Sequence, residues 1–222
     1  MKERPILFSG AMVRAILDGR KSQTRRVVRW PSAYPAKDYA EAAAAMNRSE
    51  SKVIGVRGPR DGVSDRWRCP YGTIGDNLWC RETWGEVALF SNAAEGVQGY
   101  RTVYRADPGA EESVGGYLVG DRWKPSIHMP RWASRLTLEI TGIRVERVQD
   151  ISEADARAEG AGRGWYLRDT LDGEETVPTD HRGGFRALWD SINGAKPGCS
   201  WADNPFVWVV EFKRVEQEAD RG

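Results

Sequence analysis

A continuous apolar run near the end of the chain constrains the fold most. In residues 205–215 (PFVWVVEFKRV), every side chain from Phe206 to Val210 is apolar, and most are β-branched or aromatic. Such a run predicts a strand that is buried on both faces and therefore central in a sheet. Residues 135–148 (RLTLEITGIRVERV) instead alternate apolar and polar side chains, which predicts a half-buried pair of strands with a bend at Gly142.

The remaining periodic segments predict a mixed domain. Strands are expected at 5–9, 24–29, 77–84 and 101–106, and helices after Ser9, at 152–159 and at 180–192. About six strands with few helices predict the α+β class, as a small, mostly antiparallel β-barrel decorated by helices. We expect one domain over residues 1–216 and a disordered tail at 217–222. Residues 31–66 are expected to form an irregular peripheral insertion with a short Ala-rich helix and a weak strand at 52–57.

Charge and cysteine usage exclude several classes of protein. The net charge is only +1, so any affinity for nucleic acid must come from local patches. Three scattered cysteines and two histidines make a zinc site or a disulfide framework improbable, and we expect neither metal nor cofactor. The N-terminal residues lack the apolar run of a signal peptide and no segment could span a bilayer, so we expect a cytoplasmic protein without membrane contact.

The segment 19–26 (GRKSQTRR) is a basic turn between a helix and a strand. Ser9 is a good N-cap for that helix, and Gly19 stands where a left-handed glycine ends a helix. No acid occurs between Gly19 and Trp30, whereas five cations do: Arg20, Lys21, Arg25, Arg26 and Arg29. We interpret this turn as the functional centre of the chain.

Two residues of the turn could perform chemistry. Lys21 and Thr24 are three residues apart and are expected on the same side of the turn. A lysine becomes a base when desolvation or neighbouring cations lower its pKa, and it could then accept the proton of Thr24 or, with less reason, of Ser22. Such chemistry also needs a carboxylate to orient the lysine. Glu159 is a candidate, although spacing alone does not select it.

A second stretch, residues 122–138, is also basic and free of acids. It interleaves Trp123 and Trp132 with four basic side chains: Lys124, His128, Arg131 and Arg135. Cations contact phosphates and aromatic faces stack on bases, so the mixture suits single-stranded or flipped-out nucleotides. The alternative is a solvated edge whose arginines pair with distant carboxylates. Glu82 likewise either faces a cleft or is the partner of a nearby arginine.

Several of these motifs together resemble a known family. ILDGRKSQTRR, GDNLWCRETW, VERVQDISEADARAEG and FVWVVEFKRV are similar to the ASCH family of PUA-like barrels. With CPYGTIGD, YRAD and WKPSIHMPRWASR, the chain resembles the longer ASCH proteins of phages and prophages. This resemblance covers most of residues 1–216, except roughly 31–66 and 161–178. The GRKxxT turn together with the late helix is its most specific part.

The resemblance implies binding of RNA or nucleotides in a cleft beside the barrel. Some small bacterial members hydrolyse the acetyl amide of N4-acetylcytidine with a lysine, a threonine and a glutamate. Those positions match Lys21, Thr24 and Glu159 here. Another member is thought to cleave single-stranded RNA, so the family does not define one reaction.

Three hypotheses follow for the function. The first is a binding protein for RNA or a modified base, and we expect its contacts to be Arg20, Arg25, Arg26, Glu82, Lys124, His128, Arg131 and Trp132. The second is an amidohydrolase with Thr24 as nucleophile, Lys21 as base and Glu159 as orienting group. The third is a ribonuclease or a phage interaction protein. The sequence does not decide among these three hypotheses, and it does not define the oligomeric state.

Overall fold

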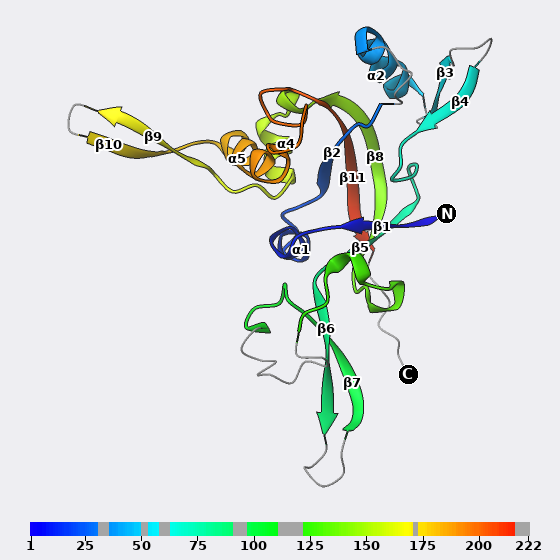
Figure 1. The fold of residues 1–222 in the computed structure, drawn as a ribbon, viewed down its shortest axis with the longest axis vertical. Helices are drawn as coiled ribbons and strands as arrows, with labels where there is room; N and C mark the ends of the chain where they lie inside the picture. Colours follow the sequence, from blue (N-terminus) through cyan, green and yellow to red (C-terminus); the bar gives the residue numbers. More distant parts are fainter. Residues whose placement is uncertain are drawn as a thin grey trace. The chain divides into compact units, whose positions relative to one another are not determined.

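Five strands form one mixed sheet in the order β1-β5-β8-β11-β2 (Figure 1). The structure is a computed structural model that describes residues 1–30, 36–49, 53–57, 63–90, 97–110, 122–170 and 173–215. The sheet strands are β1 (Glu3–Leu7), β2 (Gln23–Val27), β5 (Asn77–Arg81), β8 (Thr137–Arg147) and β11 (Phe206–Val215). Strands β1 and β5 are parallel, whereas β5–β8 and β11–β2 are antiparallel.

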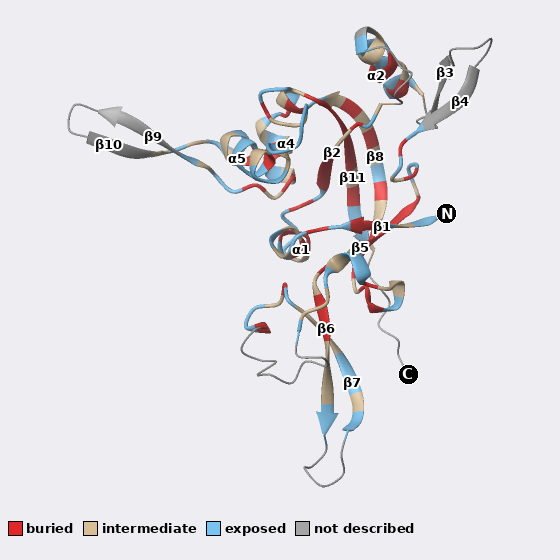
Figure 2. Ribbon diagram, in the orientation of Figure 1, coloured by how far each residue is buried: buried red, intermediate tan, exposed pale blue. Residues whose placement is uncertain are grey.

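The α+β class is confirmed. β11 lies between β8 and β2, as its apolar run predicts, and the first five of its residues are buried (Figure 2). Among the described strands no ladder that would close the sheet is found, so the barrel stays a prediction.

The chain divides into two compact units, each made of separate segments. Unit 1 comprises residues 1–19, 77–139 and 214–222, and unit 2 comprises residues 20–76 and 140–213. The expectation of one domain over 1–216 is not tested by this division and stays a prediction, and the predicted tail at 217–222 lies outside the described residues.

The described residues of unit 1 include a helix and an antiparallel hairpin besides the unit's part of the sheet. These are α1 (Gly10–Leu17) and the strands β6 (Trp84–Phe90) and β7 (Val97–Tyr104). Two 3-10 turns follow, η2 (Ser126–His128) and η3 (Arg131–Ala133). Trp84, Met129 and Ala133 form a small buried cluster against which Tyr104 packs.

The described residues of unit 2 include three helices and two further hairpins. Its helices are α2 (Tyr39–Arg48), α4 (Glu153–Ala158) and α5 (His181–Asn193), with 3-10 turns η1 (Ala36–Asp38) and η4 (Val148–Asp150). The hairpins are β3 (Val53–Arg57) with β4 (Val63–Arg68), and β9 (Trp165–Thr170) with β10 (Gly173–Pro178). The core of the unit brings α4 and α5 together with β11 through Ala156, Phe185, Trp189, Val207 and Val209.

Local sequence chemistry explains where the helices begin and end. The Ser9 hydroxyl accepts a hydrogen bond from the Met12 amide, and the Ser152 hydroxyl accepts one from Asp155. Gly19 and Gly160 have φ values of 71° and 76°, the left-handed conformation expected of a glycine just after a helix. The predicted roles of Ser9 and Gly19 are confirmed.

Residues 135–148 differ from the sequence-based prediction. They form the single eleven-residue strand β8, not a pair of strands. Gly142 does not end the strand. A side chain there would place its Cβ 2.4 Å from a carboxylate oxygen of Glu211, so Gly142 serves close packing against β11.

The insertion at 31–66 carries the short helix and the strand predicted for it. Helix α2 is held to β8 by Asn47, whose side chain donates to the Val145 carbonyl at 2.8 Å and accepts from the Val145 amide at 2.7 Å. Ala42, Ala43 and Met46 bury one face of the helix. The Ala-rich segment therefore forms a helix with one buried face.

Candidate functional site

The basic turn lies alongside the end of helix α4. Lys21 forms an isolated β-bridge with Glu159, and the Ser22 amide donates to the Ala158 carbonyl at 2.8 Å. Glu159 is the C-cap residue of α4, which ends there because Gly160 takes the left-handed conformation. The fold thus brings together two of the predicted catalytic residues that are 138 positions apart in the sequence.

Lys21 and Glu159 form a buried ion pair. The Lys21 ammonium donates to the Glu159 carboxylate at 2.7 Å and to its backbone carbonyl at 2.9 Å. Only 1% of the lysine side chain and 5% of the glutamate side chain are exposed. Burial lowers the pKa of Lys21; the Glu159 carboxylate opposes this effect, and the charges of Arg26 and Arg25 add to it. The lysine is therefore poised to lose its proton more easily than an exposed lysine.

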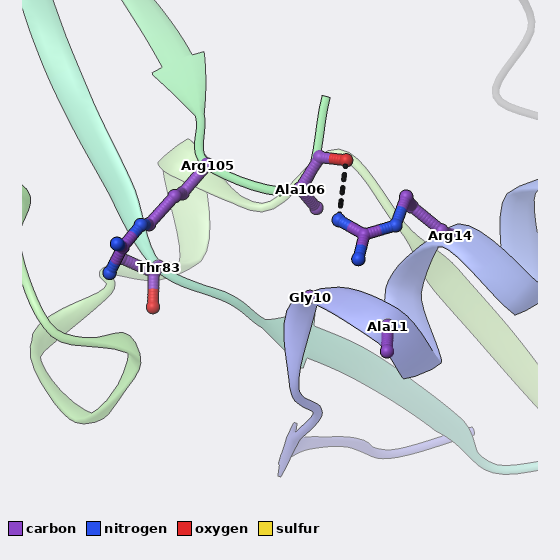
Figure 3. A pocket seen from close by; sticks show the side chains of 6 residues that line it. All are labelled: Gly10, Ala11, Arg14, Thr83, Arg105 and Ala106. Atoms are coloured by element: carbon purple, nitrogen blue, oxygen red, sulfur yellow. Dashed lines mark hydrogen bonds between the residues drawn. The ribbon is translucent and has the colours of Figure 1, made fainter. Parts of the chain in front are cut away.

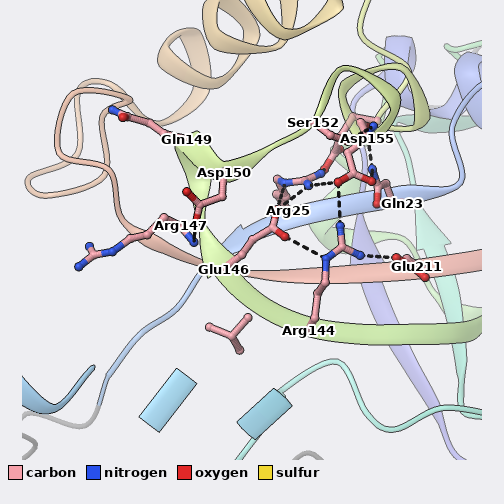
Figure 4. A network of polar contacts seen from close by, with 12 residues as sticks. Gln23, Arg25, Arg144, Glu146, Arg147, Gln149, Asp150, Ser152, Asp155 and Glu211 are labelled. Atoms are coloured by element: carbon pink, nitrogen blue, oxygen red, sulfur yellow. Dashed lines mark hydrogen bonds and ion pairs between the residues drawn. The ribbon is translucent and has the colours of Figure 1, made fainter. Parts of the chain in front are cut away.

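Arg25 holds the same glutamate from the other side. Its Nη1 donates to the second carboxylate oxygen of Glu159 at 3.2 Å. Its Nη2 reaches Glu146 at 2.6 Å and Asp155 at 3.2 Å (Figure 4). The Arg25 side chain is fully buried, and its guanidinium is paired with three carboxylates. The guanidinium faces these carboxylates and orients Glu159. The role of Arg25 as a nucleic-acid contact stays a prediction.

A second arginine completes this network at its outer edge. Arg144 forms ion pairs with Glu146, Asp155 and Glu211 (Figure 4). Gln23 adds hydrogen bonds from its amide to the Asp155 side chain and backbone. Three cations, Lys21, Arg25 and Arg144, therefore face four carboxylates. We call these residues, with Gln23, the β2–α4 network.

Thr24 occupies the alternate position on strand β2. Gln23 and Arg25 both bond to Asp155, and successive side chains of a strand point to opposite faces. Thr24 is therefore on the face of β2 opposite these two residues, where it is buried and paired in register with Val210. Its convergence with Lys21 and Glu159 stays a prediction.

The two other cations of the turn are more accessible than Arg25. Arg20 is exposed and Arg26 is half-buried, and both have further interactions within the chain. Their role as nucleic-acid contacts stays a prediction.

The predicted cations of unit 1 are paired with carboxylates. Arg131 binds Glu3 through two nitrogens at 2.9 and 3.1 Å, and Lys124 forms an ion pair with Glu86. This arrangement matches the alternative of a solvated edge with paired cations for these two residues.

Glu82 is the partner of a nearby arginine. Its carboxylate accepts two hydrogen bonds from Arg135, at 2.9 and 3.0 Å, and only 1% of the side chain is exposed. Burial raises the pKa of Glu82, and the hydrogen bonds and charge of Arg135 oppose the rise. Arg135 also pairs with Asp107. The structure thus shows Glu82 as the partner of a nearby arginine, and its role as a cleft-lining contact stays a prediction.

His128 and Trp132 are exposed residues of the second basic stretch. His128 lines an open cavity of about 380 Å³ with Arg122, Trp123, Lys124 and Pro125. Trp132 is 66% exposed and packs its edge against Trp84, with ring centroids 5.5 Å apart. These side chains offer an aromatic and cationic surface within unit 1.

Sequence reasoning did not find Glu146, Asp155 or Gln23 as members of the site. A signal was present, because Lys21, Gln23 and Arg25 are polar residues at every second position, the spacing of one strand face. Their acidic partners lie more than 120 positions away, so local reading could not identify them.

Comparison of the chain with protein-family models, with curated proteins and with solved structures gave no match in any of the three. Within the described ranges, no helix is both long and apolar enough to cross a bilayer. The same residues contain no cluster of three or more His, Cys, Asp or Glu side chains arranged to hold a metal ion.

We expect the Asp155→Asn substitution to make the free energy of unfolding fall less steeply as the pH is lowered. Burial alone would raise the pKa of Asp155, but the Gln23 hydrogen bond and the charges of Arg144 and Arg25 outweigh it and lower the pKa. A lowered pKa contributes stability that is present above the unfolded value of about 3.9 and is lost as the pH falls through the folded value. Urea unfolding of both proteins at a series of pH values below neutrality measures the difference.

The control is Asp38→Asn, because Asp38 makes no ion pair within the described structure. It should lose stability toward low pH as the wild type does. Equal acid sensitivity of the Asp155→Asn variant and the wild type would contradict the lowered pKa.

Proposed function

We propose that this chain binds RNA or a modified nucleoside, and that the Lys21–Glu159 pair reads an edge of the base. The observation that carries this proposal is the adjacency of an ammonium donor and a carboxylate acceptor at 2.7 Å, both withdrawn from solvent. A buried, fully paired charge is costly to form and contributes little net stability, so its presence favours a role in recognition.

The chemistry of the pair matches one class of base edge. Cytosine and adenine each present an exocyclic amine, which donates, beside a ring nitrogen, which accepts. A carboxylate can accept from the amine while an adjacent ammonium donates to the ring nitrogen. A base read in this way must be single-stranded or flipped out of a helix, because these atoms are otherwise paired.

The network around Glu159 supports such a role by fixing its orientation. Arg25 holds one carboxylate oxygen and Lys21 holds the other, while Glu146 and Asp155 hold Arg25. Recognition requires side chains that are locked by their neighbours before the ligand arrives. A base displaces part of the lysine contact and leaves the arginine contact in place.

Two features of unit 1 support the same class of ligand. Trp132 is exposed, and the cavity beside His128 combines the Trp123 ring with Arg122 and Lys124. Aromatic faces among cations are typical of surfaces that bind single-stranded nucleic acid.

We also propose that the chain belongs to the ASCH family, that its sheet closes as in PUA-like barrels, and that the protein is cytoplasmic. The mixed sheet of this α+β fold and the three free cysteines are compatible with these proposals.

Lys21→Met is expected to weaken binding of cytidine or of a cytidine-containing oligoribonucleotide by about tenfold or more, because a hydrogen bond from a charged group contributes about 1.5–3 kcal/mol. Glu159→Gln should weaken it similarly, since an amide oxygen accepts less strongly than a carboxylate. Calorimetric titration of the folded variants measures both effects.

The matched control is Lys196→Met, which removes an exposed ammonium group that donates to the Asn193 side chain. It should leave the affinity unchanged. Equal affinities of wild type and Lys21→Met would overturn the proposal, and so would an equal loss in Lys196→Met.

A second candidate function is hydrolysis of an acylated base, and the lowered pKa of Lys21 favours it. A neutral Lys21 amine would accept the proton of a water or of the Thr24 hydroxyl, whose oxygen would attack the acyl carbon. The carbon–nitrogen bond would then break, and the lysine would return the proton to the leaving amine. Attack by water gives the free acid directly. Attack by Thr24 leaves an ester on its oxygen, which a water deprotonated by the same lysine would hydrolyse, releasing the acid and returning the proton to Thr24. Release of cytidine from N4-acetylcytidine by the wild type, and not by Lys21→Met, distinguishes catalysis from binding alone.

A further inference from the structure

A guanidinium group can be held at one nitrogen or along its whole outline. Arg14 of α1 shows the first case: its Nη1 donates to the Ala106 carbonyl at 3.2 Å beside a cavity of about 280 Å³, and the side chain is exposed (Figure 3). Arg25 of β2 shows the second case, because Nε, Nη1 and Nη2 all donate to carboxylates and the side chain is fully buried. The way in which Arg25 is held therefore determines which of its nitrogens can face Glu159.

Glu146 holds the side edge of Arg25, which is formed by Nε and Nη2. One oxygen of the Glu146 carboxylate accepts from Nε at 3.0 Å and from Nη2 at 2.6 Å (Figure 4). Asp155 adds a contact to Nη2 at 3.2 Å. Two parallel N–H groups on one edge are what an arginine uses to bind both oxygens of a carboxylate. Glu146 therefore occupies the part of Arg25 that could otherwise bind a second carboxylate in this way.

The position of Glu146 follows from the order of the strands. β11 lies between β2, which carries Arg25, and β8, which carries Glu146. Neighbouring strands are about 4.8 Å apart, so Arg25 extends over β11, past its register partner Val209, to reach Glu146. The other oxygen of Glu146 accepts from Arg144 Nε at 2.9 Å. The carboxylate is thus fixed between two arginines.

The contact between Arg25 and Glu159 is consequently made by the remaining nitrogen. Nη1 donates to one oxygen of Glu159 at 3.2 Å, and the other oxygen accepts from the Lys21 ammonium at 2.7 Å. An arginine that turned Nε and Nη2 toward Glu159 would bind both oxygens and displace the ammonium. The pairing of Lys21 with Glu159 therefore depends on what holds the side edge of Arg25.

We propose that Glu146 is a positioning residue for the Lys21–Glu159 pair: by holding the side edge of Arg25, it leaves one oxygen of Glu159 available to Lys21 and to a bound base. The effect on Lys21 is a property of the chain without a ligand. The effect on a base rests on the proposed function.

Glu146→Met and Glu146→Gln together test this role. Methionine removes the charge and the acceptor, which leaves the buried Nε of Arg25 without a partner, and we expect the arginine to turn its side edge to Glu159. Asp155 is a poorer alternative, because both of its oxygens already accept other hydrogen bonds. Glutamine removes the charge but keeps an oxygen for Nε and Nη2. A positioning role predicts that glutamine preserves most of the wild-type behaviour, whereas a role of the charge alone predicts equal effects.

The readout is the titration of the Lys21 ammonium, followed by NMR of the full chain with isotopically labelled lysine side chains. The Lys21 signal is identified by its absence in Lys21→Met. Besides burial, the pKa of Lys21 responds to the charges of Glu159, Arg26 and Arg25, so a weakened contact with Glu159 lowers it further. In Glu146→Met the titration midpoint should fall by about one pH unit or more, and in Glu146→Gln it should stay near the wild-type value.

Glu211→Met is the matched control. Glu211 is 44% exposed and pairs with Arg144 at the outer edge of the same network, so its loss should leave the Lys21 midpoint unchanged. The unfolding temperature shows whether each variant is folded. Glu146→Asp, which keeps the charge but shortens the side chain, should shift the midpoint in the same direction and serves if the methionine variant does not fold. An unchanged midpoint in the folded variants, or equal shifts in Glu146→Met and Glu146→Gln, would overturn the proposal, as would an equal shift in Glu211→Met.

A calorimetric titration with cytidine separates this proposal from the proposed function. Glu146→Met should bind cytidine about tenfold more weakly than the wild type, and Glu146→Gln about as well as the wild type. If the wild type does not bind cytidine, the proposed function fails, and the lysine titration decides the positioning role by itself. Wild-type affinity in Glu146→Met, with a shifted Lys21 midpoint, would overturn the part of the proposal that concerns the base.

Discussion

Arg25→Met is expected to lower the free energy of unfolding by about 3–5 kcal/mol, the cost of removing one partner from a buried ion pair. Arg25 is the cation that three carboxylates share, and its side chain is fully buried. Methionine has a similar length but no charge, so Glu146, Asp155 and Glu159 would each lose a partner. Glu159 would keep Lys21, and the other two would keep Arg144. Urea unfolding followed by circular dichroism measures the loss.

The matched control for this prediction is Arg131→Met. Arg131 also binds a carboxylate through two nitrogens, but about 40% of its side chain and 44% of Glu3 are exposed. An exposed pair of this kind contributes no more than about 1 kcal/mol. Equal losses in the two variants would mean that the Arg25 network is not desolvated. Arg25→Lys should fall between wild type and Arg25→Met, since lysine restores the charge without the planar fork.

Trp208→Ala is expected to destabilise the protein by about 3–5 kcal/mol, the usual cost of deleting a large buried aromatic side chain. Trp208 is 1% exposed in β11, between the fully buried Val207 and Val209. Strand β11 is paired with β8 on one side and with β2 on the other, so the structure around the deletion cannot collapse easily to fill the space. The same unfolding experiment gives the value.

Trp165→Ala provides the comparison within unit 2. Trp165 is 67% exposed at the start of β9, so the same substitution there should change stability by no more than about 0.5 kcal/mol. A small loss in Trp208→Ala, similar to that in Trp165→Ala, would contradict the buried position of β11.

Local features of this chain could be predicted from sequence because their causes are local. Ser9 and Ser152 cap helices through hydrogen bonds to amides three residues ahead, and Gly19 and Gly160 follow helices because glycine adopts positive φ without strain. The central position of β11 followed from its apolar run. The caps depend on residues that are close in the sequence, and the central position of β11 depends only on the hydrophobicity of its side chains.

The charge partners could not be predicted in the same way. The turn at 19–26 contains no acid, which suggested free cations, but the fold brings Glu146, Asp155 and Glu159 to Arg25 from more than 120 positions away. The second basic stretch shows the same effect, since Arg131 pairs with Glu3 across 128 positions. A run of like charges therefore does not predict which side chains will lie next to it in the folded protein. The alternation of Lys21, Gln23 and Arg25 is more informative, because it indicates that the three side chains share one face of a strand.

The division of the chain into two units has a consequence for dissecting the molecule. The polypeptide passes from one unit to the other four times, after Gly19, Asp76, Glu139 and Lys213. The third passage lies inside strand β8, where no exposed linker separates the two parts. A single truncation therefore cannot isolate either unit, and any contiguous fragment would expose strand edges that the intact chain pairs. Function must be assigned to this protein by point substitution in the full chain.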